Sequence, residues 1–258
     1  MKRLMSVTRG AAAFVAGLAA LAVWGGAQAS EVTAAVAANF TAPAKEIAAA
    51  YEKATGYAVD LSFGSTGQLY TQITQGAPFD LFLSADVARI EKALKEGWGV
   101  EGTQFTYAVG TLVLWSADPK LVDSDGAVLK SGSFAHLAIA DPKTAPYGAA
   151  AVEVLTARGV LSDLKSKLVT GQNISQTFQF VTSGNAELGF VALSQVINDT
   201  TGSRWLVPND LYTPILQDAV LLKQGEQNTF AQGFLSYLKG PEAVGIIKRY
   251  GYALPAAQ

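Results

Sequence analysis

The fold is decided by the stretch at residues 31–54, EVTAAVAANFTAPAKEIAAAYEKA, in which a strand-like segment leads into a helix-like one. Residues 31–37 are apolar or small apart from the first and third, as expected of a largely buried strand. Residues 43–54 place apolar side chains at helical spacing, with Pro43 in the first turn and Gly56 as a stop. This stretch therefore predicts one strand–turn–helix unit.

The same alternation continues along the chain. Further strands are predicted at residues 57–63, 81–83, 106–115, 137–140, 188–193 and 215–222. Further helices are predicted at residues 67–75, 85–96, 147–157, 176–183, 226–238 and 241–249, and a loop at residues 117–133. Strands separated by helices indicate βαβ units and mostly parallel sheets flanked by helices. The units are too many for one small sheet, so we expect two α/β lobes.

The first 29 residues resemble a secretory signal peptide. They combine a basic start, an apolar run at residues 11–23, and the small-x-small pattern Ala27-Gln28-Ala29. The run of 13 residues is shorter than the roughly 20 that a membrane-spanning helix needs. A single membrane anchor is the alternative that these residues leave open. We expect a mature chain that begins near Ser30 and is periplasmic.

Composition excludes several classes of function. Three of the 19 Lys and Arg residues and none of the 21 Asp and Glu residues precede residue 30, so the remainder has a formal charge of −5. A mildly acidic chain without a basic run is a poor nucleic-acid binder, and we expect no such partner. The sequence has no cysteine, which excludes disulfides, thiolate metal sites and a cysteine nucleophile.

Four turns share one design, in which a strand ends, small or polar residues follow, and a helix begins. They lie at residues 37–40, 64–67, 145–148 and 173–175. The start of a helix leaves N–H groups unpaired and carries about half a positive elementary charge, which favours anions. Four such ends that converged would suit a doubly charged anion without any Lys or Arg. Each turn taken singly is better explained as an ordinary helix cap.

Enzyme motifs are missing from the sequence. Ser65 is not in a Gly-x-Ser-x-Gly turn, and the chain has no His-Glu-x-x-His, Walker or dinucleotide-binding motif. The one histidine, His136, stands at the start of a predicted apolar strand, where we expect it to be structural. A secreted hydrolase that uses Ser65 and His136 is the weaker alternative to a binding protein.

The order and spacing of several motifs resemble the molybdate- and tungstate-binding proteins of bacterial ABC importers, over nearly the whole mature region. The motifs are AANF at 37–40, GSTG at 64–67, GAPFDLFLSAD at 76–86, DP at 141–142, APYG at 145–148, LGFVAL at 188–193, YLKGPEA at 237–243 and RYGY at 249–252. The resemblance implies a type II periplasmic binding fold with the ligand in the cleft between two lobes. We place lobe 1 at residues 30–108 and 217–258, lobe 2 at residues 109–216, and the crossover strands near residues 107–109 and 213–216.

The resemblance also implies a set of ligand-binding residues. By their positions in these motifs they are Ala38, Asn39, Ser65, Thr66, Tyr147 and Ile174. Asn39 is expected to donate from its side chain and backbone, Thr66 from its hydroxyl and N–H, and Tyr147 and Ile174 from backbone N–H groups. Ser175 is the second choice for the last position. Some relatives have a tyrosine ligand where this chain has Ala192, so a fifth donor is not identified.

These residues imply capture of a tetrahedral oxyanion, molybdate or tungstate, for an inner-membrane ABC permease. A site built only of donors favours a fully ionised dianion over hydrogen phosphate, whose acid proton would lack an acceptor. Sulfate is also fully ionised and is the alternative ligand. A small organic solute is a further, less favoured alternative. We expect a monomer that is not an enzyme, needs no cofactor, and holds the metal only as an oxyanion rather than by direct coordination.

Overall fold

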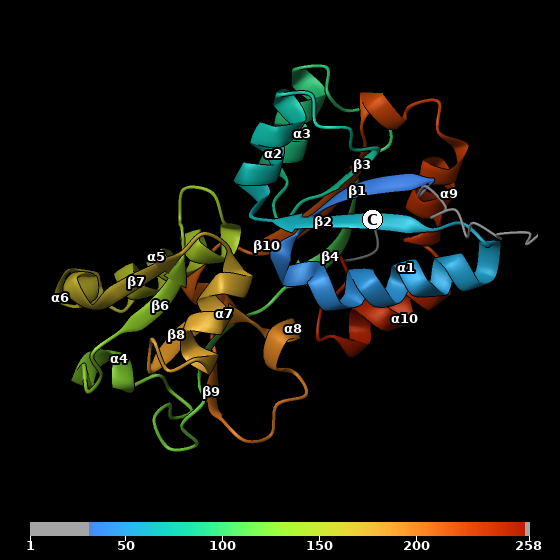
Figure 1. The fold of residues 1–258 in the computed structure, drawn as a ribbon. Coiled ribbons are helices and arrows are strands. Elements are labelled where there is room, and N and C mark those ends of the chain that lie inside the picture. Colours follow the sequence, from blue (N-terminus) through green and yellow to red (C-terminus); the bar gives the residue numbers. More distant parts are fainter. Residues whose placement is uncertain (1–30, 256–258) are drawn as a thin grey trace, which may run out of the picture.

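Two five-stranded sheets divide the chain into two α/β lobes in the computed structural model, which describes residues 31–255 (Figure 1). The strand orders are β2-β1-β3-β10-β4 and β7-β6-β8-β5-β9. Two of the four strand pairs in each sheet are parallel and two are antiparallel, so the sheets are mixed rather than mostly parallel. The antiparallel pairs all involve β10 or β5, the strands that follow a passage between the lobes. The predicted signal peptide lies outside the described residues.

The first lobe packs helices on both faces of its sheet. Its strands are β1 (Val32–Ala37), β2 (Val59–Gly64), β3 (Leu81–Leu83), β4 (Phe105–Gly110) and β10 (Ile215–Leu221). Its helices are η1 (Ala38–Phe40), α1 (Thr41–Thr55), α2 (Thr66–Thr74), α3 (Ala88–Lys95), η4 (Lys223–Gly225), α9 (Thr229–Tyr237) and α10 (Pro241–Arg249). Alternate side chains of β1 enter different cores, because Val36 packs with α1, α9 and α10 while Ala35 packs with α2 and α3. Figure 1 shows these two helix groups on opposite faces.

The second lobe repeats this layered arrangement. Its strands are β5 (Leu112–Ser116), β6 (Leu137–Ala140), β7 (Leu168–Gly171), β8 (Leu188–Ala192) and β9 (Ser203–Leu206). Its helices are α4 (Val128–Ser131), α5 (Pro146–Ala157), α6 (Leu161–Leu164), η2 (Lys165–Lys167), α7 (Ile174–Thr182), α8 (Leu193–Val196) and η3 (Asn209–Leu211). Leu114 of β5 joins the core beneath α5, whereas Val113 joins the core beneath α7. Both faces of each sheet are therefore covered, which explains the nearly continuous apolar character of its central strands.

The chain passes between the lobes at Thr111 and again in residues 207–214. The single long strand predicted at residues 106–115 is therefore wrong, because β4 belongs to the first sheet and β5 to the second. β4 and β10 pair in antiparallel fashion, with Gly110 opposite Ile215, so the two crossovers lie side by side. The predicted lobe boundaries at residues 108/109 and 216/217 fall within these two paired strands.

Most predicted elements have counterparts, and the predicted strand at 137–140 and helix at 241–249 match β6 and α10. Gly56 caps α1 in the left-handed conformation, with φ 83°, as its position after the helix predicts. The short strands β7 and β9 were not predicted, and α4 lies inside the predicted loop at 117–133. Within residues 31–255, no helix has both the length and the apolar character that a membrane span requires.

Candidate ligand-binding site

The six residues predicted to bind the ligand line one small cavity between the lobes. The cavity has about 200 Å³ of empty space, part of which is open to solvent, and is lined by Ala37, Ala38, Asn39, Gly64, Ser65, Thr66, Ala85, Ala145, Pro146, Tyr147 and Ile174. The first seven residues of that set belong to the first lobe and the last four to the second. The structure thus brings together all six predicted residues, and with them the four turns that the sequence singled out.

The two turns of the first lobe are neighbours because β1 and β2 end in register. Ala37, the last residue of β1, pairs with Gly64, the last residue of β2, in a parallel ladder. η1 follows the first strand directly, and α2 begins at Thr66 after Ser65. Both helix starts therefore emerge at the carboxyl edge of the sheet, where ligands of open α/β sheets bind.

The second lobe presents two helix starts in the same way. Ala140 at the end of β6 pairs with Gly171 at the end of β7, and α5 and α7 follow these strands. Gly148 lets α5 approach closely, since a Cβ there would lie 2.2 Å from the carbonyl oxygen of Ala140. Asn173 caps α7 by accepting a hydrogen bond from the Gln176 N–H at 3.0 Å.

The cavity is electrostatically positive without any charged side chain. Lys, Arg, His, Asp and Glu are all absent from the described residues that line it. Positive potential comes instead from the starts of α2, α5 and α7, through their unpaired N–H groups and helix dipoles. Pro146 occupies the first position of α5 and has no N–H, so the N–H of Tyr147 is the first that this helix offers. Such a site suits an anion that only accepts hydrogen bonds.

Ser65 offers the clearest candidate for a side-chain donor in this cavity. Its side chain is only 3 % exposed, and its Oγ has no hydrogen-bond partner in the described part of the chain. A buried hydroxyl without a partner is unfavourable, and such groups in native proteins generally find one. The Ser65 hydroxyl is therefore a donor available to a guest in this cavity. The sequence placed Ser65 only beside the expected donor Thr66.

Thr66 and Asn39 already have protein partners. The Thr66 Oγ1 accepts a hydrogen bond from the Ala85 N–H at 3.0 Å, and its own proton stays available. The Asn39 Nδ2 donates to the Gln217 Oε1 at 2.8 Å and to the Tyr252 hydroxyl at 3.0 Å. Both protons of this amide are thereby used. In this arrangement the Asn39 side chain stabilises the turn at residues 37–40. The backbone N–H of Asn39 remains as the donor expected for the ligand.

A buried polar network surrounds Asn39 at the junction of the lobes. The Asn39 carbonyl accepts hydrogen bonds from the Ser194 Oγ at 2.8 Å and from the Tyr252 hydroxyl at 2.7 Å. Burial raises the pKa of Tyr252 to about 12, so this hydroxyl keeps its proton at neutral pH. Sequence reasoning did not identify Ser194 or Gln217 as supporting residues. Tyr252 falls within the quoted RYGY motif, but no pattern in the sequence joined it to Asn39.

Hydrogen bonds join the two lobes on several sides of the cavity. The Gly67 N–H donates to the Thr144 carbonyl at 2.8 Å, and Arg89 Nη2 donates to the Lys143 carbonyl at 2.9 Å. On another side the Ser175 Oγ donates to the Ala38 carbonyl at 3.3 Å. Ser175, the second choice for the ligand set, thus contacts the opposite lobe, while Ile174 lines the cavity. The lobes are in contact across their cleft.

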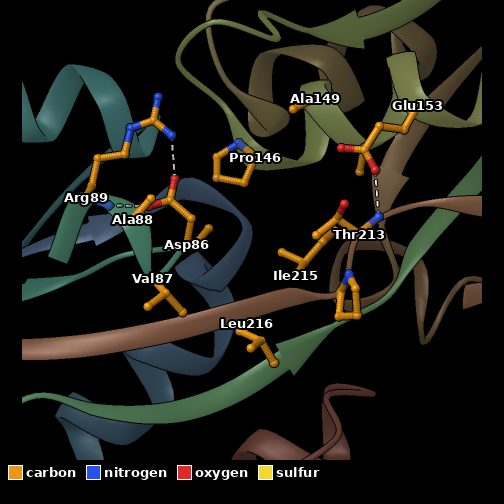
Figure 2. A pocket seen from close by; sticks show the side chains of 13 residues that line it. Asp86, Val87, Ala88, Arg89, Pro146, Ala149, Glu153, Thr213, Ile215 and Leu216 are labelled. Atoms are coloured by element: carbon orange, nitrogen blue, oxygen red, sulfur yellow. Dashed lines mark hydrogen bonds and ion pairs between the residues drawn. The ribbon is translucent and has the colours of Figure 1, made fainter. Parts of the chain in front are cut away.

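A larger groove shares Ala85 and Pro146 with this cavity, and Figure 2 shows the side chains that line it. It has about 800 Å³ of empty space, open to solvent, between the segment before α3, helix α5 and residues 213–216. Its lining is mostly apolar. Its charged groups already have partners, since Arg89 pairs with Asp86 and Glu153 accepts a hydrogen bond from the Thr213 N–H at 2.6 Å. The smaller cavity, where unpaired donors converge, is the better candidate for the binding site.

The structure does not support a Ser65–His136 pair. His136 lies at the start of β6 in the second lobe, and its side chain is 55 % exposed, so it does not have the structural role expected of it. The charged group near its Nδ1 is the Glu187 carboxylate, at 3.9 Å. Ser65 belongs to the first lobe, and its Oγ has no described partner. A serine nucleophile needs a base within hydrogen-bond reach, and none is placed here.

Two α/β lobes joined by two crossovers, with helix starts converging on a cavity between them, define a solute-binding protein. The family model described as bacterial extracellular solute-binding protein matches residues 32–253, and the chain belongs to this family. It is 61 % identical over 226 residues to the molybdate-binding protein ModA of Rhodobacter capsulatus, covering 88 % of this chain and 89 % of that one. It is 59 % identical over 252 residues to ModA of Azotobacter vinelandii, covering 96 % and 98 %.

Solved structures agree with this assignment. The periplasmic molybdate-binding protein of Azotobacter vinelandii superposes with a TM-score of 0.84 at 43 % identity, covering 87 % of this chain and 99 % of that one. The sulfate-binding protein SubI of Mycobacterium tuberculosis superposes with a TM-score of 0.72 at 12 % identity, covering 87 % of each chain. The second likeness shows the shared fold alone. The predicted type II periplasmic binding fold is confirmed.

Proposed function

We propose that this protein captures molybdate, and tungstate with it, in the cavity between its lobes and delivers the ion to an inner-membrane ABC permease. The observation that carries the proposal is a cavity that draws on both lobes, has no charged side chain among its lining residues, and includes the Ser65 hydroxyl, which has no partner among the described residues. The names of relatives at 61 % and 59 % identity, both molybdate-binding proteins, support the choice of ion.

The donors would act together on one dianion. Ser65 and Thr66 would donate from their hydroxyls, and Ala38, Asn39, Tyr147 and Ile174 from backbone N–H groups. The acid proton of hydrogen phosphate would face hydrogen-bond donors and find no acceptor. This mismatch would weaken the free energy of binding by about 1–3 kcal/mol. Sulfate has no such proton. Its rejection would depend on the size of the closed cavity, since Mo–O and W–O bonds are longer than S–O bonds.

Closure of the lobes would complete the site. An ion that touches both lobes favours the conformation in which they meet, because its contacts to both are made only there. The paired strands β4 and β10 form the natural hinge, since both passages between the lobes adjoin them. The closed form would then be the one that the permease receives.

The remaining features of the proposal concern the location, assembly and chemistry of the protein. The signal-like residues 1–29 support export to the periplasm, and the family is one of extracellular proteins. We propose a monomer that has no enzymatic activity, needs no cofactor and has no nucleic-acid partner. The metal would be held only as an oxyanion, through its oxygen atoms.

Isothermal titration of residues 30–258 with molybdate, tungstate, sulfate and phosphate tests the proposal. We expect one molybdate or tungstate ion per chain, and phosphate should bind more weakly than either because its acid proton lacks an acceptor. Sulfate should bind at least about 100-fold more weakly than molybdate, which corresponds to about 2.7 kcal/mol. Sulfate binding of equal strength would contradict the selectivity for molybdate. Failure of both molybdate and tungstate to bind would contradict the function itself.

A further inference from the structure

The side chain of Tyr147 reaches from the cavity wall to the strands that join the lobes. Tyr147 is the second residue of helix α5, lines the cavity and is 2 % exposed. Its hydroxyl lies 3.4 Å from the Nε2 of Gln217, a fully buried residue of β10. The residue whose backbone N–H faces the candidate ligand site therefore also contacts the strand that returns to the first lobe.

The same hydroxyl also packs against β4, the other strand of the hinge. A Cβ added to Gly110, the last residue of β4, would lie 2.1 Å from the Tyr147 hydroxyl oxygen and 2.8 Å from the Gln217 Nε2. Gly110 does not have a positive φ, so its backbone conformation does not require glycine. Glycine is required instead because a side chain at this position would clash with Tyr147 and Gln217. The tip of Tyr147 is thus enclosed by both strands of the hinge.

Gln217 extends this contact to the ligand-binding turn of the first lobe. Its Oε1 accepts hydrogen bonds from the Asn39 Nδ2 at 2.8 Å and from the Tyr107 hydroxyl at 3.1 Å. The pairing of β10 with β4 shifts register between Gln217 and Asp218. A buried chain of contacts therefore runs from Asn39 in one lobe, through Gln217 in the hinge, to Tyr147 in the other.

We propose that Tyr147 and Gln217 are positioning residues that couple the bound ion to the closed angle of the hinge and set its rate of release. This inference rests on the proposed capture of molybdate. With the lobes closed, the Tyr147 hydroxyl satisfies a Gln217 amide that has no access to water. When the lobes part, water can reach both groups. Their contact therefore stabilises the closed form relative to the open form, and the ion binds the closed form.

A double-mutant cycle tests the coupling, with Tyr147→Phe, Gly110→Ala and the double variant titrated with molybdate. Tyr147→Phe should raise the Kd about tenfold, mainly through faster release, because it leaves the Gln217 amide unpaired only in the closed form. Gly110→Ala should raise the Kd further by pushing Tyr147 away from the hinge. The double variant should bind more tightly than Gly110→Ala alone, because the oxygen that meets the new Cβ is gone.

A matched control separates this role from general stability. Tyr51→Phe removes another buried hydroxyl, which donates to the Phe230 carbonyl at 3.1 Å within the first lobe. It should lower the melting temperature while leaving the Kd for molybdate unchanged. Small-angle scattering should show less compaction by molybdate in Gly110→Ala than in the wild type and in Tyr51→Phe.

The outcomes distinguish this inference from the function on which it rests. If the wild type does not bind molybdate, the proposed function and the inference both fall. If the wild type binds but the effects of the two substitutions are additive, or Tyr147→Phe leaves the Kd unchanged, the inference alone is overturned. If Tyr147→Phe fails to fold, Gly110→Ala tests the coupling by itself. A molybdate affinity and a compaction equal to those of the wild type would then overturn the inference.

Discussion

At the scale of single residues, the candidate site contains two kinds of polar group. Some have no partner in the described part of the protein and are available to a ligand, whereas others are already hydrogen-bonded to protein groups that hold the site in place. The Ser65 hydroxyl is buried and unpartnered among the described residues, while the side-chain amide of Asn39 already makes two hydrogen bonds. Both residues lie next to a strand end, and both belong to the predicted set of ligand-binding residues. Their different roles depend on partners that are 178 and 213 residues away from Asn39, which local patterns do not reveal.

Ser65→Ala should weaken molybdate binding about 10- to 100-fold, because a hydrogen bond to a charged group contributes about 1.5–3 kcal/mol. The same substitution should not lower the melting temperature of the ligand-free protein, because the hydroxyl has no partner there. Titration calorimetry and thermal unfolding measure the two effects.

Ser116→Ala is the matched control for this substitution. The Ser116 Oγ is buried and donates to the Glu187 carbonyl at 2.5 Å, away from the cavity. We expect lower thermal stability and unchanged affinity, the reverse of the Ser65→Ala pattern. Equal affinity in wild type and Ser65→Ala would remove this hydroxyl from the binding site.

At the scale of helices and strands, the sequence identifies the start of each helix better than the path of each strand. Pro43 lies in the first turn of α1 and Gly56 follows its end, and both were recognised from local chemistry. The resemblance placed a crossover near residues 107–109, but the strand prediction missed the break at Thr111 because buried apolar residues continue on both sides of it, in β4 and β5. Periodicity indicates burial, but it does not tell which of two sheets buries a residue.

Gly148→Ala tests how closely α5 must approach β6. The new Cβ would lie 2.2 Å from the Ala140 carbonyl oxygen, so the helix start must move. We expect a loss of about 2 kcal/mol or more in the free energy of unfolding, since overpacking a rigid contact is destabilising. Molybdate affinity should also fall, because Tyr147 moves with the helix start.

Gly245→Ala in helix α10 provides the comparison. Its nearest neighbour would be 4.0 Å from the added Cβ, at the end of the Arg249 side chain. This substitution should raise the free energy of unfolding by about 0.5–1 kcal/mol, because alanine favours the helix interior over glycine. Urea denaturation of the two variants measures the contrast, and a tolerated Gly148→Ala would contradict the close approach.

At the scale of the whole molecule, two lobes share one design, and the ligand site exists only where they meet. Parallel pairs that end at Ala37–Gly64 and at Ala140–Gly171 aim helix starts at a common space. The sequence predicted two lobes and the turns, because alternation and helix caps are local features. That the turns converge, and that Tyr147 bridges the cavity and the hinge, depends on the angle between the lobes. No local pattern contains that angle.

The crystal structure of the protein with molybdate tests the central claim most directly. We predict the ion in the cavity between the lobes, with its oxygens accepting hydrogen bonds from the Ser65 and Thr66 hydroxyls and from N–H groups of both lobes. No Lys or Arg side chain should contact it. An ion held by Arg89 or a lysine, or seated in the larger groove beside residues 213–216, would contradict the account.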